Sequence, residues 1–66
     1  MTARQEAIKA AAALVADRLP TQVIHDYDVV AAVRDASPAW LGAHRIIADT
    51  KRAAHSLRFE RIQAAK

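Results

Sequence analysis

The chain has 66 residues, a formal net charge of +3 and 53% apolar residues, seventeen of which are alanine. It holds no cysteine, one glycine and two prolines, which excludes a disulfide scaffold, a cysteine-ligated metal centre, a thiol nucleophile and a glycine-rich nucleotide loop. No apolar run reaches the ~18 residues of a membrane span, and no apolar signal-peptide core follows the charged start. We therefore expect residues 1–66 to form one soluble, cytoplasmic domain with a thin core.

The first predicted element is a helix over residues 2–19. Its apolar residues recur at the three-four spacing of one helical face. Thr2 is a suitable N-cap, and the alanines in the middle of the segment favour helix and close approach of a neighbour. Pro20 ends the helix, because the residue before a proline disfavours helical backbone.

A connector and a second helix follow. The β-branched residues of the Thr21–Ile24 segment allow a short extended piece. Asp26 is the predicted N-cap of a helix over residues 27–36, whose valines and alanines supply a buried face. We expect His25 and Asp26 to make loop and cap contacts, and Tyr27 to be half-buried.

The clearest local signal in the chain is the Ser37-Pro38 pair. Serine suits an N-cap, and proline suits the first helical position because the backbone amide there has no intrahelical acceptor. The pair predicts a third helix over residues 38–65, in which Gly42 would mark a close backbone approach. The sequence thus predicts an all-α, three-helix domain whose third helix is long and basic.

The excess positive charge belongs to the C-terminal third of the chain. Residues 1–43 sum to −1, whereas residues 44–66, which end with Lys66, sum to +4. On a helix, most cations and histidines of that third fall in one stripe beside the apolar face. The stripe includes His44, Arg45, Lys51, Arg52, His55 and Arg58. Such a stripe suits a polyanionic or acidic partner; the alternative is a solvated surface that only keeps the chain soluble.

Large apolar residues interrupt this stripe. Phe59 and Ile62 fall within it if the helix continues, and we expect them to meet another chain, most simply a second copy. The alternative is that the helix ends near Ser56, so that both side chains fold back into the core. Trp40 is expected to pack in the core by default, with an interface anchor as the alternative.

No residue pattern indicates catalytic or metal chemistry. His44 and His55 are eleven residues apart in the sequence, ~16 Å along a helix, which is too far to share an ion. The two glutamates, Glu6 and Glu60, lie in different elements, so paired-carboxylate catalysis has no support. We expect no enzyme activity, no cofactor, no bound metal and no small-molecule substrate.

The order of the elements suggests two functions. A second helix, a short break at Ala36-Ser37-Pro38 and a basic third helix have the order of a helix-turn-helix, although the usual turn glycine is missing. On this basis the chain is a small DNA-binding transcriptional regulator of bacterial or phage type, acting as a dimer, with Arg45, Lys51, Arg52 and Arg58 on duplex DNA. The alternative is a protein-interaction module, an adaptor or small inhibitor, that docks on an acidic protein surface through Phe59, Ile62 and the surrounding arginines. A structural subunit of a larger assembly is a third reading.

Overall fold

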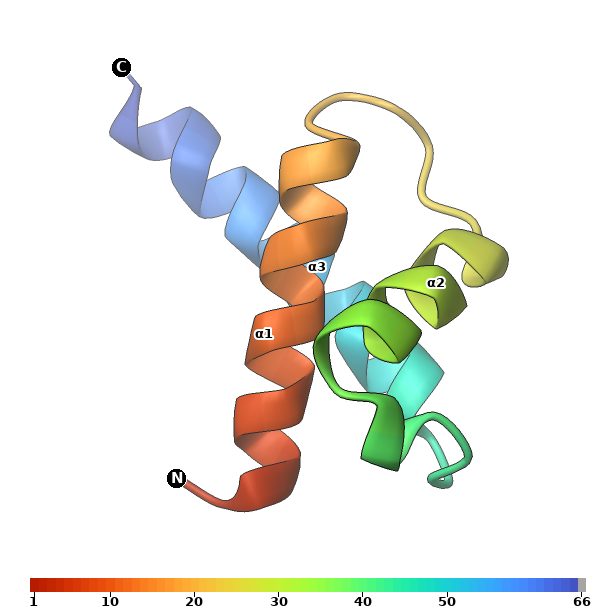
Figure 1. Ribbon diagram of the computed structural model, residues 1–66. Helices are drawn as coiled ribbons and strands as arrows, with labels where there is room; N and C mark the ends of the chain where they lie inside the picture. The colour runs from red at the N-terminus through yellow and green to blue at the C-terminus, as the bar shows by residue number, and fades with distance from the viewer. Residues whose placement is uncertain (66) are drawn as a thin grey trace.

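The computed structural model describes residues 1–65, which form three α-helices and one short 3-10 helix, with no strand in that range. The α-helices are α1 (Ala3–Arg18), α2 (Asp26–Ala36) and α3 (Ile46–Ala64), and the 3-10 helix η1 spans Pro38–Trp40. Helix α1 lies across the front of the domain, with α2 on one side and α3 crossing behind it (Figure 1). The predicted all-α, three-helix architecture is confirmed.

Helix α1 follows the prediction within one residue at each end. Thr2 caps it: its hydroxyl accepts from the Gln5 amide at 3.1 Å, and the Gln5 side chain accepts from the Thr2 amide at 2.8 Å. Small residues dominate its buried face, namely Ala7, Ala11, Ala12, Val15 and Ala16. Because these side chains are short, both other helices can approach α1 closely.

Helix α2 begins one residue earlier than predicted. Asp26 is its first helical residue and not its N-cap, which is His25. The Asp28 carboxylate accepts from the His25 backbone amide at 3.0 Å, so Asp28 supplies the cap contact assigned to Asp26. The preceding connector is not a strand: Ile24 is buried in the core, but Val23 is 73% exposed.

The prediction that the third helix begins at Pro38 is wrong. Pro38 does start a helical turn, but η1 ends at Trp40, a turn covers residues 41–45, and α3 begins only at Ile46. Arg45 breaks the helix with a left-handed backbone, φ 66°, a conformation that costs energy in a residue with a Cβ. The nine-residue connection from 37 to 45 lets the chain place both Trp40 and Ile46 against the core, which a continuous helix does not do.

Near this break one prediction holds in position and another is wrong. Ser37 is the N-cap of η1 and Pro38 stands at its start, as predicted, but the Ser37 hydroxyl makes no cap hydrogen bond and donates to the Ala7 carbonyl of α1 at 3.5 Å. No heavy atom lies within 4 Å of where a Cβ on Gly42 would stand, so this glycine marks an open turn and not a close backbone approach.

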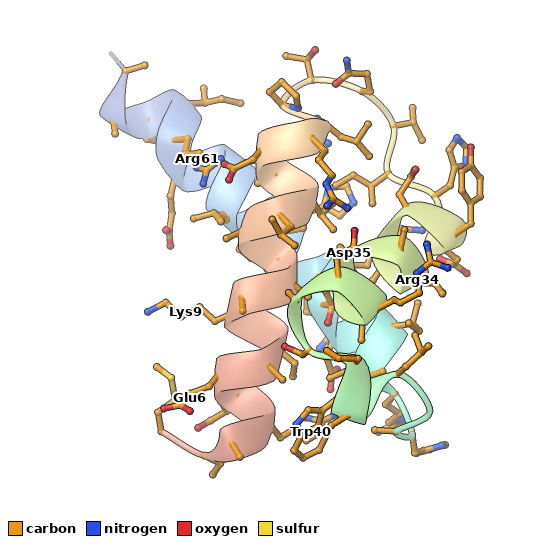
Figure 2. All side chains as sticks on the ribbon, viewed as in Figure 1. Glu6, Lys9, Arg34, Asp35, Trp40 and Arg61 are labelled. Carbon is orange, nitrogen blue, oxygen red and sulfur yellow. The ribbon has the colours of Figure 1, made fainter. Side chains whose placement is uncertain are left out.

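The core is a thin layer between the three helices. It contains Ala11, Ala12, Val15, Ile24, Val29, Ala32, Val33, Ile46 and Ala54. Thr50 is also fully buried, and its hydroxyl has no hydrogen-bond partner among the described residues. Trp40 is half-buried and packs on this cluster beside the lower part of α1 (Figure 2), as its default interpretation predicts.

Candidate nucleic-acid interface

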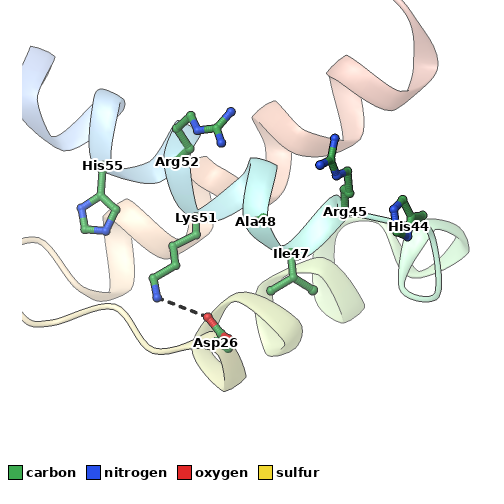
Figure 3. A pocket seen from close by; sticks show the side chains of 8 residues that line it. All are labelled: Asp26, His44, Arg45, Ile47, Ala48, Lys51, Arg52 and His55. Atoms are coloured by element: carbon green, nitrogen blue, oxygen red, sulfur yellow. Dashed lines mark hydrogen bonds and ion pairs between the residues drawn. The ribbon is translucent and has the colours of Figure 1, made fainter.

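An open groove of about 780 Å³ lies between the start of α2 and the first half of α3 (Figure 3). Its lining residues are Asp26, His44, Arg45, Ile47, Ala48, Lys51, Arg52 and His55. Five of the six side chains that the sequence predicts for nucleic-acid binding therefore line one groove. We call this surface the basic groove.

The tertiary structure gathers these five side chains by a different route from the predicted stripe. His44 and Arg45 belong to the turn before α3, not to the helix itself. Lys51 and His55 are four residues apart on α3 and therefore share a side of it, with Arg52 beside them (Figure 3). Arg45, Arg52 and both histidines are exposed, so their donors can reach a ligand in the groove.

The backbone adds to the positive potential of the basic groove. The first turn of α3 contributes Ile47 and Ala48 to its wall, and no side chain caps this end of the helix within residues 1–65. The N-terminal end of a helix carries partial positive charge on its free amides. An anion in the groove is therefore attracted by both side chains and backbone.

An acidic residue near this helix end is held away from the groove. Asp49 lies in the first turn of α3, where Arg4 of α1 donates to its carboxylate. This hydrogen bond, aided by the positive charges of Arg4, Arg52 and Arg45, holds the pKa of Asp49 below its ordinary value despite partial desolvation. Asp49 stays ionised, and its carboxylate pairs both with Arg4 of α1 and, at 3.9 Å, with Arg52 of α3; Asp49 is not among the residues that line the groove.

The sixth predicted side chain, Arg58, lies outside the basic groove. Its guanidinium donates to the backbone carbonyl of Gln22 at 2.7 Å, which ties α3 to the connector before α2. One turn further on, Arg61 pairs with Asp17 at 2.8 Å and reaches the upper end of α1 (Figure 2). Arg58, the last member of the predicted stripe among the described residues, is thus bound by the chain itself, as is Arg61, which lies outside that stripe. Lys66 lies outside the described residues.

The exposed apolar residues also lie on the second half of α3. The helix continues to Ala64, so the alternative in which it ends near Ser56 is wrong. Phe59 is 63% exposed and Ile62 is 54% exposed, and neither folds into the core. A smaller groove of about 430 Å³ opens nearby between α1 and α3, with Ile8, Ala12, Ala53 and Leu57 among its lining residues.

Sequence reasoning missed two features beside the basic groove. Asp26, predicted to be a cap, pairs with Lys51 across the groove at 3.2 Å. Tyr27, predicted to be half-buried, is 70% exposed and stacks on His25 with ring centres 5.4 Å apart. Both contacts involve the first turn of α2, which begins at Asp26.

Comparison with protein families, with curated proteins and with solved structures finds no match to this chain. Within residues 1–65, no three histidine, aspartate or glutamate side chains are grouped so that they could hold a metal ion. No helix in the same range combines the length and the apolar character that crossing a membrane requires.

Proposed function

We propose that this protein binds duplex DNA through the basic groove. The observation that carries the proposal is the convergence of Arg45, Lys51 and Arg52, with two histidines, around the uncapped start of α3. Phosphate oxygens are recognised by this combination of cationic side chains and helix N-terminal amides. We propose further that the protein acts as a transcriptional regulator and as a dimer, as many small DNA-binding domains do.

The length of the connection between α2 and α3 does not match a helix-turn-helix. A helix-turn-helix joins its two helices by about 3–4 residues, whereas nine residues separate α2 from α3 in this chain. The resemblance in element order therefore gives little support. The proposal depends on the charge of the groove and on the exposed first half of α3, which would enter or flank the major groove.

Salt dependence tests the proposal quantitatively. Arg58 lies outside the basic groove, which leaves three cations, Arg45, Lys51 and Arg52, for phosphate contacts. If all three contact phosphates, the logarithm of affinity should fall with the logarithm of salt at a slope near −2.7. The measurement is fluorescence anisotropy of a labelled duplex of about 20 base pairs at about 50 and 200 mM salt. Absence of binding at the lower salt concentration removes duplex DNA as the partner.

A second candidate function is a protein-interaction module, favoured by the exposure of Phe59 and Ile62 on the outer side of α3. Large apolar side chains left in water suit docking on another protein. Under this function, the double variant Phe59→Ala/Ile62→Ala loses association with itself or with an acidic partner but keeps the binding of duplex DNA. Light scattering at micromolar concentration reports the association, and an unchanged mass in the double variant rejects these two residues as anchors.

A further inference from the structure

We propose that the Asp26 carboxylate acts as an internal competitor for phosphate in the basic groove and makes the groove selective for ligands that carry several phosphates. This inference rests on the proposed function, because it concerns the same groove. Asp26 extends from the first residue of α2 and pairs with Lys51 of α3, with Oδ1 and Nζ 3.2 Å apart (Figure 3). Among residues 1–65 it is the only acidic side chain that lines this groove.

The need to cap α2 does not explain this carboxylate. The contact with the backbone at the start of α2 is made by Asp28, which accepts from the His25 amide. The Asp26 side chain is 77% exposed, and an exposed ion pair adds little to folding stability. Asp26 lies in the first turn of α2, where the helix dipole favours an acid, and its charge also lies where a ligand phosphate would meet Lys51.

The three other ion pairs that join helices within residues 1–65 lie elsewhere in the fold. Arg4–Asp49 and Arg61–Asp17 join α1 to α3, and Arg18–Asp35 joins α1 to α2. Of the four acidic partners, only Asp26 lines the basic groove. This difference supplies a matched control, because Asp35 pairs with an arginine at 2.8 Å but is not among the groove residues.

A ligand in the groove must either displace Asp26 from Lys51 or bind beside its negative charge. Either alternative makes binding less favourable by a free energy that does not depend on the size of the ligand. The reason is that like charges repel and that the Lys51 ammonium already has a partner. A single phosphate gains too few contacts to offset that cost. A nucleic-acid backbone also reaches Arg45 and Arg52, and these additional phosphate contacts offset the free energy of displacing the carboxylate. Asp26 thereby discriminates between a polymer of phosphates and free phosphate or a mononucleotide.

The test compares Asp26→Asn with Asp35→Asn, since both substitutions remove one paired carboxylate and raise the net charge by one. Binding of the labelled duplex at about 50 mM salt should tighten about fivefold in Asp26→Asn and less than about twofold in Asp35→Asn. Inorganic phosphate should compete with the duplex measurably better in Asp26→Asn than in the unmodified protein. Circular dichroism checks that both variants fold, and Asp26→Ser replaces Asp26→Asn if the latter does not.

Each outcome has a defined meaning. Equal gains in the two variants show that only overall charge matters and overturn the internal competitor. An unchanged affinity in Asp26→Asn, with the unmodified protein binding the duplex, also overturns it and leaves the proposed function standing. If neither the unmodified protein nor any variant binds the duplex, the proposed function itself fails.

Discussion

The two halves of α3 carry similar charges but differ in how these charges are placed. In the first half, Lys51 and Arg52 border an open groove that the preceding Arg45 also lines; Lys51 pairs there with Asp26, and Arg52 lies 3.9 Å from the Asp49 carboxylate. In the second half, Arg58 and Arg61 are bound by Gln22 and Asp17 of the same chain. The difference teaches that a count of cations on one helix does not measure its free positive charge. Interhelical partners decide which cations remain available to a ligand.

The same substitution should lower stability by very different amounts in the two halves. Ile46 is 1% exposed and Ile62 is 54% exposed. Ile46→Ala should lower the free energy of unfolding by roughly 2–5 kcal/mol, since it removes buried methyl groups and leaves a cavity, whereas Ile62→Ala should cost less than about 0.5 kcal/mol. Urea denaturation measures both. Similar losses at the two positions would mean that the second half of α3 is also buried.

Removal of two cations of the basic groove should weaken DNA binding, whereas removal of two cations from the second half of α3 should not. Arg45→Asn with Arg52→Ala should weaken duplex binding by about tenfold or more and reduce the salt slope by nearly 2. Asparagine is chosen because it tolerates the left-handed backbone at position 45. Arg58→Ala with Arg61→Ala, which removes the same charge, should change affinity by less than about threefold. Equal losses in the two pairs would place the DNA along the whole of α3.

Removal of a buried hydroxyl in the first half of α3 should stabilise the fold. Thr50 is 0% exposed, and its Oγ1 has no partner within residues 1–65. Thr50→Val replaces this hydroxyl with a methyl group of similar shape, so it should raise the free energy of unfolding by about 1 kcal/mol. Thermal denaturation is the measurement. A lower melting temperature in Thr50→Val would show that the Thr50 hydroxyl makes a hydrogen bond that stabilises the fold.

The smallest effect concerns the ion pair that joins α1 to the start of α3. Because Arg4 lowers the pKa of Asp49, the pair stabilises the fold at pH values above the ordinary range of a carboxyl group. That contribution disappears as the pH falls through the lowered pKa and the folded state takes up the proton. Asp49→Asn should therefore melt a few degrees lower at pH 7, and the difference should vanish in strong acid. A difference that persists there would show that the loss is not due to the charge.

The start of the third helix shows why part of the fold could not be predicted from the sequence. Ser37-Pro38 is a genuine signal for a helical turn, and the chain obeys it for the three residues of η1. Gly42 lowers the helix propensity of the segment after Trp40, but no local signal fixes the end of the turn at Trp40 or the start of α3 at Ile46. Trp40 packs against the core and Ile46 lies within it, on either side of the turn that separates η1 from α3, and Arg45 takes a left-handed backbone just before α3 begins.

Most residues of the candidate site could be predicted from the sequence, but their arrangement in space could not. The excess of positive charge after residue 43 is visible in the sequence and identifies five residues of the basic groove. The role of Asp26 depends on α2 lying beside α3, and the loss of Arg58 depends on the connector crossing near α3. These are contacts across 25 and 36 residues of chain, which no local pattern encodes.

The sequence alone determined that this protein is helical, where its first two helices begin and end within a residue or so, and which third of the chain is basic. Those properties follow from local propensity, capping and charge, which act over a few residues. The tertiary structure decided where α3 starts, which cations are free and which acid lies among them. Such choices depend on which side chains meet when three helices share one thin core, because burial and ion pairing are properties of the packed chain.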